Sequence, residues 1–350
     1  MRALVFDGVR ARLERAQASP GDAAGASVDL LLRPRRVAIS SLDLDAARPG
    51  SGFRGVLGHS CVGVVERALA AASASGAGDD LLAAARKMVG KTVVVSPVIP
   101  CGACDLCLRG LPAHCRNAEI VGLKGRDGCL AEAVRVPAGC CAPAPEGLDD
   151  DAAACAAGVA AALHAAQQAR ADQRSLVTVL GDGRMGLVIA QALARVCPKV
   201  RVLGRHEHRL ALCERWGVAH RAEREAGRRA DQDAVVECTG TAEGLALALA
   251  MVRPRGRVVL VSRLREAGAV DLRPAVDREA EIVGSRGGSI PEALALLGQG
   301  AIDVLSLITR RFRLDDAEQA LRAAGEASQV QVVVEVDEKA SRHEASGHRA

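Results

Sequence analysis

The chain has 350 residues, of which 49% are apolar, so it can bury a large core and form about two domains. Its net charge of +4 is spread without a basic block, and aromatic residues make up only 1%, which argues against a nucleic-acid-binding surface. No apolar stretch is long enough to span a bilayer. From these two observations we expect neither nucleic acid nor a membrane as a partner.

Residues 1–66 carry the pattern of an antiparallel β domain. Short apolar runs at 3–6, 28–32 and 56–65 are separated by Gly, Pro and Ser. Alternation of this kind predicts strands joined by turns. The chain opens without the apolar segment of a secretion signal, so we expect a cytoplasmic protein. In that reducing compartment, clustered cysteines indicate a metal rather than disulfides.

Four of the twelve cysteines form such a cluster, at Cys101, Cys104, Cys107 and Cys115. Three thiols at every third position can surround one centre, and the fourth completes a tetrahedron. Four thiolates suit Zn²⁺ at about 2.3 Å each, and they leave no position for a substrate, so we predict one structural zinc ion per chain. A redox C-x-x-C pair lacks its usual βαβ surroundings here, and an iron–sulfur cluster remains the alternative.

A helix is predicted next. An acidic start at residues 149–151 precedes an Ala-rich run that ends at Gln168. Carboxylates at the start of a helix interact favourably with its dipole, so the sequence predicts one helix over 149–168.

A dinucleotide-binding fingerprint follows a β-branched strand at 177–180. It has three glycines with the spacing G-x-G-x-x-G and leads into an apolar helical run at 187–196 and a second strand at 200–204. The diphosphate of a nucleotide would bind at the positive N-terminus of that helix. The residues of the fingerprint are Gly181, Asp182, Gly183, Arg184, Met185 and Gly186.

Strands and helices then alternate, which predicts an α/β region with a doubly wound parallel sheet. The predicted strands are 234–238 and 257–261, and the predicted helices are 208–216, 242–252, 291–297 and 315–324. A last strand is expected at 330–336. The polar residues from Asp337 onward are expected to be disordered.

The end of the second strand bears on the choice of nucleotide. NAD sites place a carboxylate there for the ribose 2′-hydroxyl, whereas this chain has Gly204 followed by Arg205. His206, His208 and Arg209 add to a cationic cluster that suits a 2′-phosphate, so NADP is preferred over NAD. Glu207 lies about 20 residues past the fingerprint, which keeps NAD open.

Several motifs together resemble the zinc-containing medium-chain alcohol dehydrogenases, within them the threonine- and polyol-dehydrogenase-like branch. The motifs are Gly55–His59 with Val62–Val65, the four cysteines, Gly125–Gly128 with Ala131 and Glu132, the fingerprint, and Gly284–Arg286. The resemblance implies a small-molecule substrate, a homodimer or homotetramer, and an active site in a cleft. It also implies a GroES-like substrate domain at 1–155 with a zinc lobe near 98–118, a Rossmann domain at 156–290, a C-terminal return at 291–336 and a tail at 337–350.

The catalytic zinc of that family is held by a Cys, a His and a third Cys or Glu. By resemblance, the Cys falls on Ser40, the His on His59 and the third ligand on Ala157. The family's relay hydroxyl falls on Leu42, and the acid after the His falls on Ser60. We therefore expect the catalytic zinc to be lost. A site rebuilt with Cys61, Cys155 or His164 is the alternative.

Three functional hypotheses follow. The first is an NAD(P)-dependent oxidoreductase that transfers hydride to or from a small alcohol or activated carbonyl, with His59 or Ser40 donating a hydrogen bond or proton. The second is a non-catalytic relative that only binds the dinucleotide. The third is a zinc alcohol dehydrogenase with a rebuilt ligand set.

Overall fold

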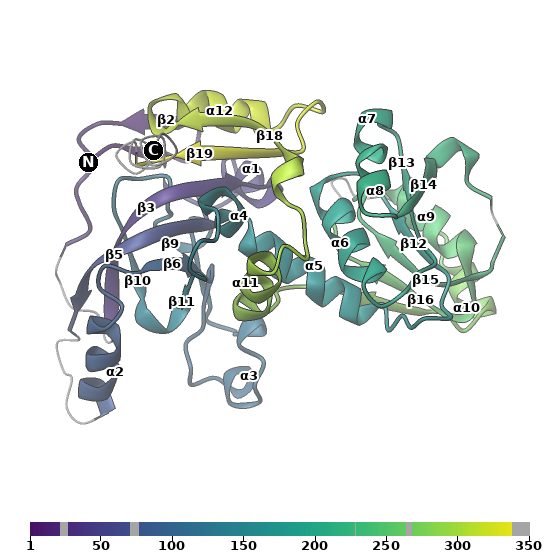
Figure 1. Cartoon of the computed structure of the whole chain (residues 1–350), viewed down its shortest axis with the longest axis horizontal. Coiled ribbons are helices and arrows are strands. Elements are labelled where there is room, and N and C mark those ends of the chain that lie inside the picture. The colour runs from purple at the N-terminus through teal and green to yellow at the C-terminus, as the bar shows by residue number, and fades with distance from the viewer. Residues whose placement is uncertain (22–26, 71–76, 228, 264–267, 338–350) are drawn as a thin grey trace, which may run out of the picture. The chain divides into compact units, whose positions relative to one another are not determined.

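The computed structural model describes residues 1–21, 27–70, 77–227, 229–263 and 268–337, and it divides the chain into two units (Figure 1). Unit 1 comprises Met1–Ala157 and Leu307–Ala350, and unit 2 comprises Gly158–Ser306. The tail that we expect to be disordered lies, apart from Asp337, outside the described residues.

Unit 2 ends later than residue 290, the limit that the sequence indicates. The side chain of Gln191 donates to the backbone oxygen of Asp303 at 3.0 Å and accepts from its N–H at 2.7 Å. The ring nitrogen of Trp216 donates to the carboxylate of the same residue at 3.2 Å. These bonds attach the segment after residue 290 to unit 2, so the chain returns to unit 1 at Leu307.

The main sheet of unit 1 pairs a strand from the N-terminal part of the chain with a strand from its C-terminal part. Its long strand β3 (Asp29–Ile39) pairs antiparallel with β5 (Cys61–Leu69) and with β19 (Gln331–Glu335). The C-terminal strand β19 also pairs, in parallel, with β18 (Ile308–Arg313). The strand predicted at 330–336 is thus confirmed.

The remaining elements of unit 1 are short. The strands are β1 (Ala3–Phe6), β2 (Ala11–Glu14), β4 (Gly55–Val56), β6 (Thr92–Val95), β7 (Val98–Ile99), β8 (Glu119–Val121), β9 (Gly125–Arg126), β10 (Val134–Pro137) and β11 (Cys141–Pro143). The helices are α1 (Ser41–Ala46), α2 (Ala77–Arg86), α3 (Asp105–Leu108), α4 (Asp150–Ala154) and α12 (Ala317–Ala324). The main sheet has the order β11-β6-β5-β3-β19-β18, with β10 also on β3, and two smaller sheets have the orders β2-β1-β4 and β7-β8-β9.

Aliphatic side chains fill the core of this unit. Leu30 and Leu32 of β3 and Val332 and Val334 of β19 are buried in one cluster. Each pair is two residues apart, the period at which a strand presents side chains to one face. Burying such a side chain stabilises the fold by about 1.5–3 kcal/mol, so a chain with so few aromatic residues can still hold a firm core.

Unit 2 contains a six-stranded parallel sheet with the order β14-β13-β12-β15-β16-β17. The strands are β12 (Val177–Leu180), β13 (Val200–Gly204), β14 (Ala219–Ala222), β15 (Gln232–Glu237), β16 (Val252–Leu260) and β17 (Glu281–Gly284). The prediction of a doubly wound parallel sheet is confirmed. Strand order reverses between β12 and β15, and ligands of such folds bind where the strands on either side of that point end.

Unit 2 also contains α-helices. They are α5 (Ala156–Gln168, which starts in the last residues of unit 1), α6 (Arg184–Ala194), α7 (Glu207–Leu210), α8 (Leu212–Arg215), α9 (Ala242–Met251), α10 (Arg273–Asp277) and α11 (Ile290–Gly298). Helix α6 packs on β12 and β13, and α9 packs on β15 and β16. No helix of the described residues is both long and apolar enough to cross a membrane.

The helix predicted over 149–168 is interrupted. Asp149 caps α4, because its side chain accepts from the N–H groups of Asp151 at 2.8 Å and Ala152 at 3.2 Å. The N–H of Cys155 bonds back only three residues, to the oxygen of Ala152 at 3.1 Å. This tight last turn ends α4, and α5 begins at the next residue.

Candidate cofactor, metal and proton-transfer sites

The glycine fingerprint forms the turn between β12 and α6. Gly181 has a φ of +107°, which side-chain-bearing residues rarely adopt. A Cβ on Gly186 would lie 2.0 Å from the backbone oxygen of Gly181, so glycine is required for this close approach of helix and strand. A Cβ on Gly183 would meet nothing within 4 Å, and no side chain caps the helix there. Open space at an uncapped helix start fits the diphosphate of a dinucleotide.

Asp182 follows β12 in the chain, and its side chain packs against Gly204 at the end of β13. Its carboxylate accepts from the backbone N–H of Arg205 at 2.9 Å and of His206 at 2.6 Å, and it lies 3.0 Å from Nδ1 of His206. A Cβ on Gly204 would lie 2.5 Å from this carboxylate. Asp182 therefore fills the place of a side chain at position 204 and ties the turn before α6 to the end of β13.

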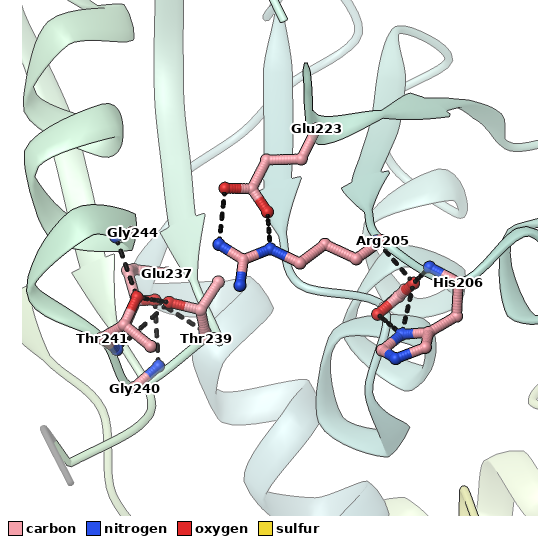
Figure 2. A network of polar contacts seen from close by, with 9 residues as sticks. Arg205, His206, Glu223, Glu237, Thr239, Gly240, Thr241 and Gly244 are labelled. Atoms are coloured by element: carbon pink, nitrogen blue, oxygen red, sulfur yellow. Dashed lines mark hydrogen bonds and ion pairs between the residues drawn. The ribbon is translucent and has the colours of Figure 1, made fainter. Parts of the chain in front are cut away.

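Arg205 extends from the same strand end toward Glu223. Its Nε and Nη2 atoms donate to the two carboxylate oxygens of Glu223 at 2.5 and 3.0 Å (Figure 2). Glu223 begins the 3-10 turn Glu223–Glu225 that follows β14. The cation predicted to select the nucleotide is thus paired with an acid that sequence reasoning missed.

A second missed group lies at the end of β15. The buried carboxylate of Glu237 accepts from the backbone N–H of Thr239 at 2.6 Å and of Gly240 at 3.2 Å, and from the Thr239 hydroxyl (Figure 2). The hydroxyl of Thr239 lies 3.0 Å from that of Thr241, which caps α9 by accepting from Gly244 at 3.0 Å. An acid that ends a buried strand and precedes a Thr-Gly-Thr turn is the sequence signal that marks this edge of the sheet.

The four cysteines of the predicted zinc lobe converge. Their sulfur atoms all lie within 4.8 Å of one another, with Cys104 at 3.5 Å from Cys107 and 3.9 Å from Cys115. A zinc tetrahedron with bonds of about 2.3 Å has sulfur–sulfur edges of about 3.8 Å, so these residues fit the ion. Backbone N–H groups of Arg116 and Cys107 lower the pKa of Cys104 to about 6, whereas desolvation and the neighbouring thiols raise the pKa of Cys107 to about 12. The geometry of the four sulfur atoms, rather than these pKa values, indicates the metal site.

His59 contacts a buried acid in unit 1. Its Nδ1 lies 2.9 Å from Oδ1 of Asp43, and both side chains are buried. Burial acts to raise the pKa of Asp43, but the attraction of His59 and the bonds from His59 and Ser40 outweigh it and hold the pKa below the ordinary value of 3.8. Asp43 is therefore an ionised carboxylate that fixes the orientation of the imidazole ring through its Nδ1 atom.

Ser40 belongs to the same cluster, at the start of α1. Its backbone N–H donates to Oδ2 of Asp43 at 2.8 Å, and its hydroxyl oxygen accepts from the N–H of Leu42 at 3.0 Å. These two residues form a capping box. The Ser-x-x-Asp spacing is the signal that identifies Asp43 in the sequence, where our reasoning overlooked it.

The other substituted positions have contacts of their own. The hydroxyl of Ser60 donates to the backbone oxygen of Ala154 at 2.7 Å, inside the unit. Leu42 is 41% exposed, and Ala157 lies in the first turn of α5. The alternative ligands differ in setting: Cys61 and Cys155 are buried thiols, whereas Nε2 of His164 lies 3.5 Å from the Gln168 amide.

Comparison with known proteins identifies the family. Residues 26–146 match the alcohol dehydrogenase GroES-like domain, and residues 185–299 match the zinc-binding dehydrogenase domain. Together the two matches cover more than half of the chain. The chain belongs to the zinc-type medium-chain alcohol dehydrogenases. The expected combination of a GroES-like domain and a Rossmann sheet is thereby confirmed, and the chain is an NAD(P)-dependent oxidoreductase of this family that acts on small molecules.

Named relatives in the family include polyol dehydrogenases. A sorbitol dehydrogenase of Arabidopsis thaliana is 29% identical, over 75% of this chain and 74% of its own length. An L-idonate 5-dehydrogenase of Vitis vinifera is 27% identical, over 77% of this chain and 75% of its own. A zinc-binding dehydrogenase structure from Sinorhizobium meliloti 1021, bound to NADP, superposes with a TM-score of 0.81 and 25% identity, covering 96% of this chain and 99% of that one.

Proposed function

We propose that this protein transfers hydride between a nicotinamide dinucleotide, with NADP preferred over NAD, and a small carbonyl or alcohol, without a catalytic zinc ion. The observation that carries the proposal is the buried pair of His59 and Asp43. His59 matches the His ligand of the family's catalytic zinc. The positions of the other two ligands hold Ser40 and Ala157, which supply no thiolate or carboxylate.

The loss of ligands decides whether a second zinc ion can be held. A structural zinc site contributes on the order of 10–16 kcal/mol, so each of four ligands accounts for roughly 3 kcal/mol. Losing two of the three protein ligands should abolish tight binding. The hydroxyls of Ser40 and Ser60 support this reading, because they already bond to α1 and to Ala154. The zinc of the protein is then the structural ion at Cys101, Cys104, Cys107 and Cys115.

His59 supplies or removes the proton. Because Asp43 accepts at Nδ1, the ring presents Nε2 to a substrate oxygen, and general acid catalysis of this kind contributes about 10²–10⁴ in rate. Bound NADPH supplies the hydride. Ser40 is a positioning residue rather than the proton donor, since its groups serve the capping box around Asp43.

The substrate should need little Lewis-acid help. Without a metal to polarise its oxygen, a plain ketone is a poor acceptor, whereas an activated carbonyl or a conjugated enone accepts hydride with a hydrogen bond alone. We therefore expect turnover with enones, quinones or activated aldehydes before simple polyols.

The nucleotide assignment rests on the end of β13. Gly204 offers no carboxylate to a ribose 2′-hydroxyl, and the oxygens of Asp182 are already bonded to Arg205 and His206. Arg205 is paired with Glu223, but its side chain is 63% exposed, and a guanidinium is the group best suited to a phosphate. The relative from Sinorhizobium meliloti 1021 that binds NADP supports the same choice. By family resemblance we also propose a homodimer or homotetramer.

A second candidate function is nucleotide binding without turnover. Concerted changes at Ser40, Leu42, Ser60 and Ala157 beside an intact fingerprint favour it. One experiment separates the two: NADPH oxidation by the purified protein across aldehydes, ketones, enones and quinones, together with its thermal shift with NADPH. Turnover supports the oxidoreductase. Stabilisation without any turnover supports the binding protein, and failure to bind either nucleotide contradicts both.

A further inference from the structure

Arg205 and Glu223 form a two-bond ion pair at the place where a 2′-phosphate would bind. The pair uses the Nε and Nη2 atoms of Arg205, at 2.5 and 3.0 Å from the two carboxylate oxygens (Figure 2). The Glu223 side chain is 22% exposed, whereas that of Arg205 is 63% exposed. Glu223 is therefore the more buried partner, and the guanidinium of Arg205 is the group that a ligand can reach.

Three carboxylates act on the guanidinium of Arg205. The carboxylates of Glu223, Glu243 and Asp182 all raise its pKa. Asp182 has its charge compensated in part by the N–H groups of Arg205 and His206, but Glu223 faces the guanidinium directly. One carboxylate thus cancels the charge of the cation that should attract a phosphate.

We infer that Glu223 is a specificity-determining residue, which weakens binding of a nucleotide that carries a 2′-phosphate and leaves binding of NAD unchanged. This inference rests on the proposed function, because it requires Arg205 to contact the ribose 2′ position. NAD has a neutral hydroxyl there, so the charge of Glu223 matters little to it. NADP has a dianion there, which Glu223 repels while it competes for the same guanidinium.

An effect of the opposite sign is also physically defined. Glu223 could assist by holding Arg205 in one conformation, with the free Nη1 atom presented to the phosphate. Holding an Arg side chain costs rotamer freedom, and a preformed ion pair saves part of that cost when the phosphate binds. Against this saving stand two costs: the phosphate has to compete with Glu223 for the guanidinium, and the charge of Glu223 repels the dianion. A glutamine at 223 separates the two effects, because its amide oxygen can still accept from Arg205 without carrying charge.

The test is the affinity of wild type and Glu223→Gln for NADPH and NADH, measured by titration calorimetry on the full chain. We expect Glu223→Gln to bind NADPH tighter by on the order of fivefold, since exposed charges act through water and are screened by salt. Its affinity for NADH should stay within about twofold. The gain in affinity for NADPH should shrink at about 0.5 M salt, because the screening length is then only about 4 Å.

Two variants serve as controls. Glu225→Gln removes the same charge from the same turn, at a residue paired with Arg224 at 3.9 Å rather than with Arg205, and should change neither affinity. Arg205→Ala should weaken NADPH binding. Adding Glu223→Gln to it should restore only the part that comes from direct repulsion of the 2′-phosphate by Glu223, because no guanidinium is left to compete for.

The outcomes separate this inference from the proposed function. Weaker or unchanged NADPH binding by Glu223→Gln, or an equal gain in Glu225→Gln, would overturn the inference while wild-type binding still supports the function. If wild type and every variant fail to bind both nucleotides, the inference and the proposed function are both contradicted. 2′-AMP carries a phosphate at the ribose 2′ position, and 5′-AMP does not. If Glu223→Gln raised the affinity for both equally, the inference would also be overturned, because the effect must depend on the 2′-phosphate.

Discussion

At the scale of single residues, Asp43 determines what His59 can do. The carboxylate is fully buried, yet its pKa lies below the ordinary value of 3.8 because the bonds from His59 and Ser40 outweigh burial. An acid that is ionised inside the fold binds fewer protons than it does in the unfolded chain. Its contribution to stability is therefore present above pH 3.8 and is lost as the pH falls through the lower folded-state value.

We predict that Asp43→Asn destabilises the protein by about 3–5 kcal/mol at pH 7, because it removes one partner of a buried pair. The difference in Tm between wild type and Asp43→Asn should stay constant from pH 7 down to about pH 5, and it should narrow as the pH falls below 3.8 through the folded-state pKa of Asp43. Thermal unfolding followed by circular dichroism measures it. A Tm difference that does not depend on pH would show that Asp43 is not ionised in the folded protein.

His59 gives the matching prediction for activity. His59→Gln keeps a hydrogen-bonding side chain beside Asp43 but cannot transfer a proton, so kcat should fall by about 10²–10⁴. The Kd for NADPH should not change, since the fingerprint lies in the other unit. Ser40→Ala should mainly lower the Tm, by an amount that reflects a lost cap of about 1 kcal/mol. Equal losses of kcat in both variants would count against the proton-transfer role of His59.

At the scale of elements, two glycines of the fingerprint have different roles: Gly183 precedes α6, and Gly186 lies in its first turn. Gly183→Ala adds a methyl group into open space, whereas Gly186→Ala drives one to 2.0 Å from the oxygen of Gly181. We predict that Gly183→Ala leaves the Tm within about 1 °C while weakening NADPH binding at least tenfold, because the methyl group occupies the space for the diphosphate. Gly186→Ala should instead lower the Tm by several degrees. Calorimetry and thermal unfolding of both variants test the assignment.

The cysteine lobe is the second element with a separable role. Cys104→Ser should remove the zinc ion and unfold the lobe near residues 98–118, since the sulfur of Cys104 lies within 4 Å of two others. NADPH binding by unit 2 should persist. Zinc content by mass spectrometry and proteolysis of the lobe report the change. A variant that keeps its zinc would indicate that the four thiols do not form the metal site.

The range of a signal decides what the sequence can predict at this scale. The fingerprint and the cysteine lobe are local patterns, so their residues could be named from the sequence. Glu223 could not, because it reaches Arg205 only through the pairing of β13 with β14, which no short motif encodes. The break between α4 and α5 was also missed, since Ala-rich sequence favours helix on both sides of Cys155.

At the scale of the whole molecule, the sequence predicted the fold class and the family because several separate motifs agreed. The sheet of unit 2 and the sulfur cluster are formed, while Ser40 and Ser60 make bonds within unit 1. The proposed loss of the catalytic zinc is therefore compatible with an intact fold. The end of unit 2 was placed too early because the contacts of Gln191 and Trp216 with Asp303 are long-range.

The most direct test of this account is the position of zinc in a crystal of the zinc-replete protein, from anomalous scattering at the zinc absorption edge. We predict one anomalous peak per chain, at the centre of the sulfur atoms of Cys101, Cys104, Cys107 and Cys115, and none beside His59. A second, fully occupied peak bonded to His59 would contradict the account and would assign the protein to the conventional zinc alcohol dehydrogenases.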